Sequence, residues 1–200
     1  YNEVALTGGA DAETTAEVDE RFKAKINSYA GTSTWAIKSA TLELDCVRSC
    51  AIQEHAPPLK DVYNLTIYVE DGSGAASNEV IEKVKKEIEG DSNTCGHLAP
   101  GINIRVKAPK VVPVDFDVTA TVYRTDRDFA QSEISKVIAE YTNGLIIGKP
   151  VIISELINRI ISIKYVHDVT VNSPAMNVEP TSEGICRFNS AVVDVAEDRS

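Results

Sequence analysis

The chain has 200 residues and a mass of 21.7 kDa, which is enough for one large domain or two small ones. Its 43% apolar and 25% charged residues are typical of a globular protein and exclude a disordered chain. With 20 basic and 30 acidic side chains the formal net charge is −10, which argues against a general nucleic-acid binder and a polybasic membrane anchor, because both need clustered lysine and arginine.

The first element expected is an amphipathic helix over residues 11–29. Four apolar residues recur at helical spacing and are expected to form its buried face: Val18, Phe22, Ile26 and Tyr29. Thr14 and Glu17 have the spacing of a capping box. After Gly31, Thr32 or Ser33 is placed to cap a short second helix, on which Trp35 is expected to belong to the core rather than to anchor an interface.

Two strands and a surface helix follow. Residues 46–54 and 64–70 predict the strands, with Pro57-Pro58 ending the first and the turn sequence at residues 71–74 ending the second. Residues 77–89 predict a helix whose charged residues face solvent. Its apolar stripe consists of Val80, Ile81, Val84 and Ile88.

The second half of the chain is expected to contain a similar set of short helices and strands. Strands are expected over residues 102–107 and 111–124, and the second of these alternates between apolar and polar residues from Val114 to Val122. One parity is apolar and predicts a buried face: Val114, Phe116, Val118, Ala120 and Val122. A helix over residues 128–141 should bury Ile134, Val137, Ile138 and Tyr141. Ser154 is then expected to cap a helix through Ile163, followed by strands over residues 165–171 and 187–195.

These elements predict an α+β fold, with two small modules of short helices packed on mixed or antiparallel sheets. The modules are expected at residues 11–110 and 111–200, and Pro109 and Pro113 bracket the boundary. Residues 1–10 are expected to be a lead-in that continues from a preceding region of a longer protein. Residues 1–100 carry 17 acidic and 9 basic side chains, a net of −8, whereas residues 101–200 carry 13 and 11, a net of −2. The second module is therefore the better candidate for packing against neighbours.

The cysteines are too few for a disulfide framework. They are Cys46, Cys50, Cys95 and Cys186. A zinc site would have to combine the first three with His55 and His97, but no Cys-x-x-Cys knuckle is present. The alternative interpretation is that they are small buried hydrophobic residues, with Cys46 and Cys50 on one face of a strand.

No motif with a strong catalytic mechanism is present. The glycines at positions 8, 9, 72 and 74 do not form a phosphate-binding loop, and the three histidines are scattered. Asp115 and Asp117 share a strand face, as a catalytic carboxylate pair might, but alternating acids are more simply the solvent side of a strand. We therefore predict a protein that is not an enzyme, with no catalytic, cofactor-binding or metal-binding residues, and this favours an assembly role.

Several stretches match one family pattern in chain order. TGGADAET (residues 7–14) leads into an acidic helix, and Gly31-Thr32 and Asp71-Gly72 follow. INIRVKAPKVVPVDFDVTATV (residues 102–122) and VIISELINRIISIKYVHDVTV (residues 151–171) then correspond to a linker with a long strand and to a strand–helix–strand ending. Taken together, residues 7–171 resemble the phage baseplate J-like family, the Mu-like baseplate proteins of contractile tails and related injection machines. Residues 172–200 have no counterpart in this pattern.

The resemblance implies a structural subunit of a contractile tail, or of a phage-derived injection particle, that forms part of the baseplate wedge around the central hub. The implied partners are other wedge, hub and sheath-proximal subunits, with no nucleic acid and no membrane insertion. The implied location is the virion tail baseplate, after assembly in the host cytoplasm. Because wedge contacts gain from several partners binding at once, we expect the isolated chain to self-associate only weakly.

Two other functions remain open from the residues alone. The same combination of predicted helices and strands also fits a fibre-attachment or adhesin-type binding module. A metal-dependent hydrolase would rest on the scattered cysteines and histidines and on the Asp115/Asp117 pair.

Overall fold

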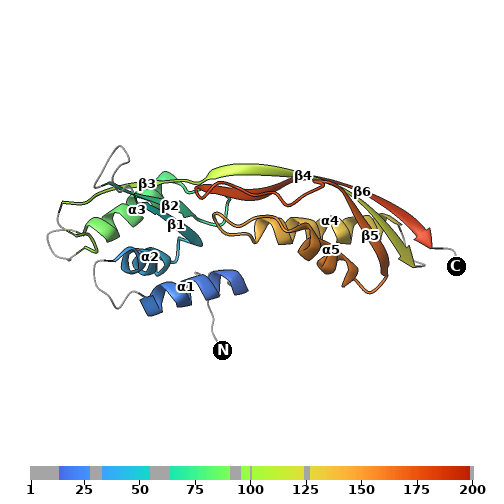
Figure 1. Ribbon diagram of the computed structural model, residues 1–200, viewed down its shortest axis with the longest axis horizontal. Helices are drawn as coiled ribbons and strands as arrows, with labels where there is room; N and C mark the ends of the chain where they lie inside the picture. Colours follow the sequence, from blue (N-terminus) through green and yellow to red (C-terminus); the bar gives the residue numbers. More distant parts are fainter. Residues whose placement is uncertain are drawn as a thin grey trace, which may run out of the picture. The chain divides into compact units, whose positions relative to one another are not determined.

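A computed structural model describes residues 14–27, 33–54, 64–90, 96–99, 101–123 and 127–198 (Figure 1). The described residues fall into two compact units, one reaching Gly72 and continuing over Ser77–Lys107, the other comprising Ser73–Ala76 and the chain from Ala108 onward. Each unit packs short helices on a three-stranded mixed sheet, so the predicted α+β fold is confirmed. The beginning of the family-like stretch, residues 7–13, lies outside the described part.

The first unit is built from three helices and three strands: α1 (Thr15–Asn27), α2 (Thr34–Leu42), β1 (Ser49–Glu54), β2 (Asn64–Glu70), α3 (Asn78–Glu89) and β3 (Asn103–Lys107). β2 is the central strand, antiparallel to β1 and parallel to β3. Consistent with that place, its residues from Leu65 to Glu70 are all buried. The Ser33 and Ser77 hydroxyls accept backbone N–H groups at the beginnings of α2 and α3, so both helices start with an N-cap.

α1 contradicts the prediction about its buried face. Val18 is 43% and Phe22 63% exposed, whereas Ala24 and Glu17 are buried. The helix packs on α2, where Glu20 forms an ion pair with Lys38. Small and charged residues thus form the packed side of α1, and its large apolar residues point away. The side chain of Ile26, and Tyr29 altogether, lie outside the described part of the chain.

The second unit contains β4 (Lys110–Tyr123), α4 (Arg127–Asn143), α5 (Ile153–Ile161), β5 (Val166–Ser173) and β6 (Gly184–Asp198). The strand order is β5-β4-β6, with β5 antiparallel and β6 parallel to the central β4. α4 and α5 lie on one side of this sheet (Figure 1). The predicted parity of β4 is confirmed, because all five of its even-numbered apolar residues from Val114 to Val122 are buried in one core with residues of both helices.

Two expectations about the boundaries in this unit are wrong. Ser154 does not cap α5; the helix begins at Ile153, and its N-cap, Ile152, makes no side-chain capping bond. Distant side chains bind this end of the helix instead: the Asn177 Oδ1 accepts the Ile153 N–H at 3.0 Å, and the Tyr141 hydroxyl accepts the Ile152 N–H at 2.9 Å. β6 is also longer than the predicted residues 187–195, because it pairs with β4 along nearly all of that strand.

In the part of the chain that the structure describes, no helix is long and apolar enough to cross a bilayer.

The packing of α5 gives a matched pair of adjacent residues for a stability measurement. Ile160 is fully buried in the core of the second unit, whereas its neighbour Ile161 is 43% exposed. Ile160→Ala should lower the free energy of unfolding by about 2–5 kcal/mol, because it removes buried methyl groups and leaves a cavity. Ile161→Ala should cost less than about 1 kcal/mol. Denaturant unfolding followed by circular dichroism measures both, and equal costs would contradict the assigned helix face.

Candidate interaction surfaces

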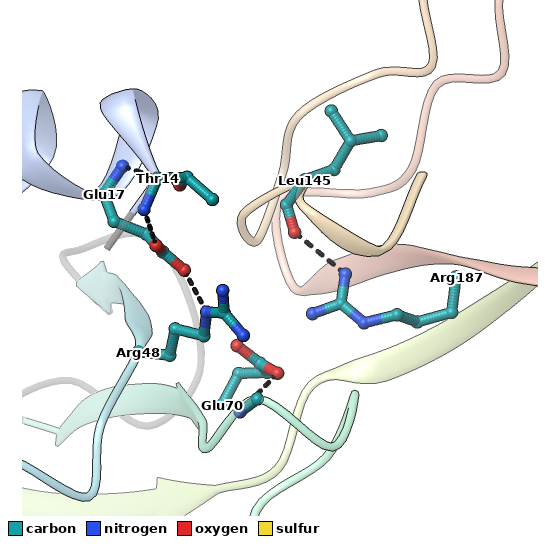
Figure 2. A network of polar contacts seen from close by, with 7 residues as sticks. Thr14, Glu17, Arg48, Glu70, Leu145 and Arg187 are labelled. Atoms are coloured by element: carbon teal, nitrogen blue, oxygen red, sulfur yellow. Dashed lines mark hydrogen bonds and ion pairs between the residues drawn. The ribbon is translucent and has the colours of Figure 1, made fainter. Parts of the chain in front are cut away.

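A network of polar contacts ties the beginning of α1 to the sheet of the first unit (Figure 2). The predicted capping box is present: the Glu17 carboxylate accepts the Thr14 N–H at 2.5 Å, and the Thr14 hydroxyl accepts the Glu17 N–H at 3.3 Å. The other oxygen of this carboxylate accepts a hydrogen bond from the Arg48 guanidinium, which forms an ion pair with it. Glu17 is buried, so its charge depends on these donors.

Arg48 extends the network to the end of β2. Its backbone N–H donates to the Glu70 carbonyl at 2.8 Å, and the carboxylate of Glu70, which is also buried, accepts the Gly72 N–H at 2.7 Å. Figure 2 shows the Arg48 side chain between the carboxylates of Glu17 and Glu70. Buried charge therefore holds α1, the entry to β1 and the turn after β2 together. The capping box is visible in the sequence, but the link between Glu17 and Arg48, 31 residues apart, is not.

A hollow of about 470 Å³ adjoins this network in the first unit. The turn between α2 and β1 supplies most of its wall, together with α1 and the end of β2: Glu17, Arg21, Leu42, Glu43, Leu44, Asp45, Cys46, Val47, Arg48 and Asp71. Two of its acids are already paired, Glu17 with Arg48 and Glu43 with Lys25. Part of the charge that lines the hollow is therefore engaged in ion pairs, an arrangement that fits a structural role.

The cysteines are separated by the structure. Cys50 lies on β1 and Cys186 on β6, both buried, whereas half-buried Cys46 lies in the turn before β1; the expectation that Cys46 and Cys50 share a strand face is wrong. Burial raises the pKa of the Cys50 thiol to about 12, so it stays protonated. His55 and Cys95 lie outside the described residues, and among the described ones no three His, Cys, Asp or Glu side chains are grouped to hold a metal.

Asp115 and Asp117 lie on the face of the second sheet that α4 and α5 leave uncovered. Asp115 accepts hydrogen bonds from the Ser190 hydroxyl at 2.5 Å and the Asn189 amide at 2.7 Å. The bond from Ser190 has the larger effect and that from Asn189 the smaller one, and together they hold the pKa of the Asp115 carboxyl below its usual range. Asp117 accepts the Asn172 amide at 3.2 Å. A proton donor in general acid catalysis needs a raised pKa, so the environment of Asp115 does not suit that role. Both aspartates instead accept hydrogen bonds from side chains of neighbouring strands.

Trp35 is 45% exposed, so the expectation that it belongs to the core is wrong. The Lys38 ammonium lies 5.9 Å from the centroid of its ring, and the same Lys38 pairs with Glu20 of α1. Among the described side chains of α1 and α2, three large apolar residues are therefore exposed: Val18, Phe22 and Trp35. Exposed aromatic residues are enriched in protein–protein interfaces.

The second unit has a polar clamp of its own, which Figure 2 also draws. Arg187 of β6 donates from Nη1 to the Leu145 carbonyl at 2.8 Å and to the Cys186 carbonyl at 2.9 Å. Its side chain also runs beside Gly74, where a Cβ would lie 3.2 Å from Arg187 atoms and where φ is +92°. Glycine at position 74 thus leaves room for the arginine that fastens β6 to the loop after α4.

Most of the second unit matches a known protein domain. Residues 114–193, which run from β4 into β6, match the Baseplate J-like protein C-terminal domain. This stretch of the chain is similar to the C-terminal domain of baseplate J-like proteins. The match includes residues beyond 171, for which sequence analysis found no counterpart, and it does not include the first unit.

A solved structure is similar to the chain at the level of the fold. A chain of the anti-feeding prophage baseplate, seen by cryo-electron microscopy with 6-fold symmetry applied, is similar with a TM-score of 0.52 at 15% sequence identity. The similarity covers 88% of the present chain and 42% of that one, so the present chain spans less than half of its structural neighbour. No curated protein sequence matches.

The Glu17–Arg48 pair predicts a specific loss of stability. Arg48→Met should destabilise the first unit by about 1–3 kcal/mol, because it leaves the buried Glu17 carboxylate without its charged donor. The control is Lys25→Met, which removes an ion pair with Glu43 in which both side chains are more than half exposed, and should cost less than about 1 kcal/mol. Urea unfolding of both variants measures the difference; an Arg48→Met cost as small as that of the control would contradict the structural role of the network.

The cysteine environments predict an order of chemical reactivity. Among the three described cysteines, Cys46 should react first with a thiol reagent in the native protein, because Cys50 and Cys186 are buried and their thiol pKa values are raised by desolvation. Mass spectrometry of peptides after timed alkylation assigns the sites. Rapid native-state labelling of Cys50 would contradict this environment.

Proposed function

We propose that the chain is a structural subunit of the baseplate of a contractile injection system, either a phage tail or a phage-derived particle. The observation that carries this proposal is the family match over residues 114–193, which spans most of the second unit, from its central strand through both helices to β6. The similar fold of the anti-feeding prophage baseplate chain supports it. We place the subunit in the wedge around the central hub, in contact with other wedge, hub and sheath-proximal proteins.

The chemistry of the described residues supports a role in assembly rather than in catalysis. The strongest carboxylate pair, Asp115 and Asp117, is hydrogen-bonded to Ser190, Asn189 and Asn172 of the neighbouring strands. The buried acids of the first unit hold secondary-structure elements together. Exposed apolar side chains on α1 and α2 offer contact surface instead of a substrate pocket.

The proposed place of action is the baseplate of the particle, which assembles in the host cytoplasm before release. An isolated subunit of such an assembly gains affinity only when several partners bind together, so self-association of the purified chain should be weak. Sedimentation velocity over a range of concentrations tests that part separately from the location in the particle.

The decisive experiment combines particle purification with gene deletion. Mass spectrometry of baseplates isolated from sheathed particles should detect the chain, and deletion of its gene should abolish assembled contractile particles. Complementation with Ile161→Ala should restore particles, because this exposed position leaves the core intact. Absence of the chain from purified baseplates, or normal particles after deletion, would refute the proposal. Normal contracting particles that only fail to attach to cells would instead identify an adhesin-type module.

A further inference from the structure

The last strand of the second unit is an edge strand with an unusual length of open backbone. β6 has 15 residues and, among the strands that the structure describes, pairs on one side only, with β4. Its first part is covered: the Phe188 N–H donates to the Asn143 side chain at 3.1 Å, and Arg187 binds the Leu145 carbonyl. A register shift at Asn189 follows. Beyond it, among the described residues, the outward backbone groups of residues 190–196 have no hydrogen-bond partner outside the sheet.

The opposite edge of the same sheet is different. β5 has 8 residues, and the Asp168 carboxylate accepts the N–H of Val169 at 2.9 Å, which occupies an edge donor. Pro174, which cannot donate a backbone hydrogen bond, follows its last residue. Charged or proline-blocked edges are the usual protection against strand addition, and β5 has both devices. β6 places the sequence SAVVDVA along its open stretch, which is rich in strand-forming valine.

The uncovered face beside this edge carries charge of one sign. Its side chains from the register shift onward are short, mostly polar and exposed or half-buried: Asp115, Asp117, Thr119, Thr121, Asp168, Thr170, Asn172, Ser190, Val192, Asp194 and Ala196. Four are aspartates, and no lysine or arginine occurs in residues 114–123, 166–173 or 188–196. The depressed pKa of Asp115 keeps that carboxylate ionised. Val192, opposite Asp117 in the register, is 60% exposed on this face.

We propose that residues 190–196 of β6 are a docking edge for an extended strand of a different protein, which adds to the sheet and bears lysine or arginine on the side that lies over the aspartate face. Main-chain hydrogen bonds to the open edge would supply affinity, and the alternating side chains would supply specificity. A second copy of this chain is disfavoured as the occupant, because pairing two β6 strands side by side would bring together two faces whose charged residues are all aspartates.

This inference goes beyond the proposed function and does not depend on it, since it concerns the chemistry of a partner strand. Its first test uses the full chain and a fluorescent peptide of alternating lysine and valine, about as long as the open stretch of β6. Fluorescence anisotropy should show saturable binding. The matching peptide of alternating glutamate and valine should bind at least about tenfold more weakly, a difference of about 1.4 kcal/mol.

Two N-methylated peptides test whether the contact is strand addition. Each carries methyl groups on the backbone nitrogens of one edge only. A docked strand that pairs through one edge tolerates methylation of the other, so one of the two peptides should bind like the parent and the other should fail to bind. Equal binding of both would overturn the proposal in favour of simple charge attraction.

Matched charge reversals locate the site. Asp117→Lys with Asp194→Lys should weaken binding of the lysine peptide at least about tenfold, or about 1.4 kcal/mol. The control, Glu82→Lys with Glu89→Lys on α3, changes the net charge equally and should leave binding unchanged. Asp194→Lys alone, at an exposed position, keeps the test valid if the double variant does not fold, and should weaken binding about threefold. Equal effects of the two double variants would overturn the site.

Self-association provides the remaining test. If sedimentation shows that the unmodified chain forms dimers, and Asp194→Lys changes the fraction of dimer, the edge is occupied by a second copy and the proposal is wrong. Failure of the lysine–valine peptide to bind the unmodified chain would refute the docking edge. It would not bear on the baseplate location, because that location is tested by the composition of purified particles.

Discussion

The alternation of β4 is the constraint on which the second unit depends. The even-numbered residues of β4 from Val112 to Val122 are all apolar, so this side of the strand has to be covered, and α4 and α5 cover it with fully buried residues such as Ile138 and Ile160. Within the described part of the chain no layer covers the odd-numbered side, which carries aspartate and threonine from Asp115 to Thr121. Because β4 is long and central, it also fixes the length of β6, which follows it in parallel from Lys110 to Tyr123. The core, the bare face and the extended edge thus follow from one strand.

The first unit is organised by a different interaction. There the buried Glu17 carboxylate meets Arg48, and small Ala24 allows α1 to lie on α2, so charge and close approach replace a large apolar face. Breaking such a pair leaves an uncompensated charge, which gives the geometry its specificity even if the pair adds little net stability over an apolar core. The outward position of Phe22 is a direct consequence, since the side of α1 that carries Glu17 is already engaged.

How far the sequence could predict this molecule differs between the two units for that reason. Periodicity located β2, α3, β4 and α4 closely, because each buries a regular set of apolar side chains, and the capping box at Thr14 was correct because it is a local contact. The buried side of α1 could not be read from periodicity, because its partner is Arg48, distant in sequence. Trp35 and Ser154 failed similarly: Lys38 provides a surface for the tryptophan ring, and Asn177 supplies the hydrogen bond that a local cap would have made.

The candidate surfaces were still less predictable, because an interface is defined by what remains unpaired after folding. The sequence shows that β6 is rich in valine and free of lysine after Arg187, yet only the strand order reveals that one of its edges is open. An open valine-rich edge is an aggregation hazard that proteins generally block. Here the bare face next to it is acidic, so identical chains repel where they would otherwise pair, whereas a cationic strand is attracted. A face that discourages self-pairing while leaving the backbone accessible suits a subunit that must remain separate until a different protein arrives.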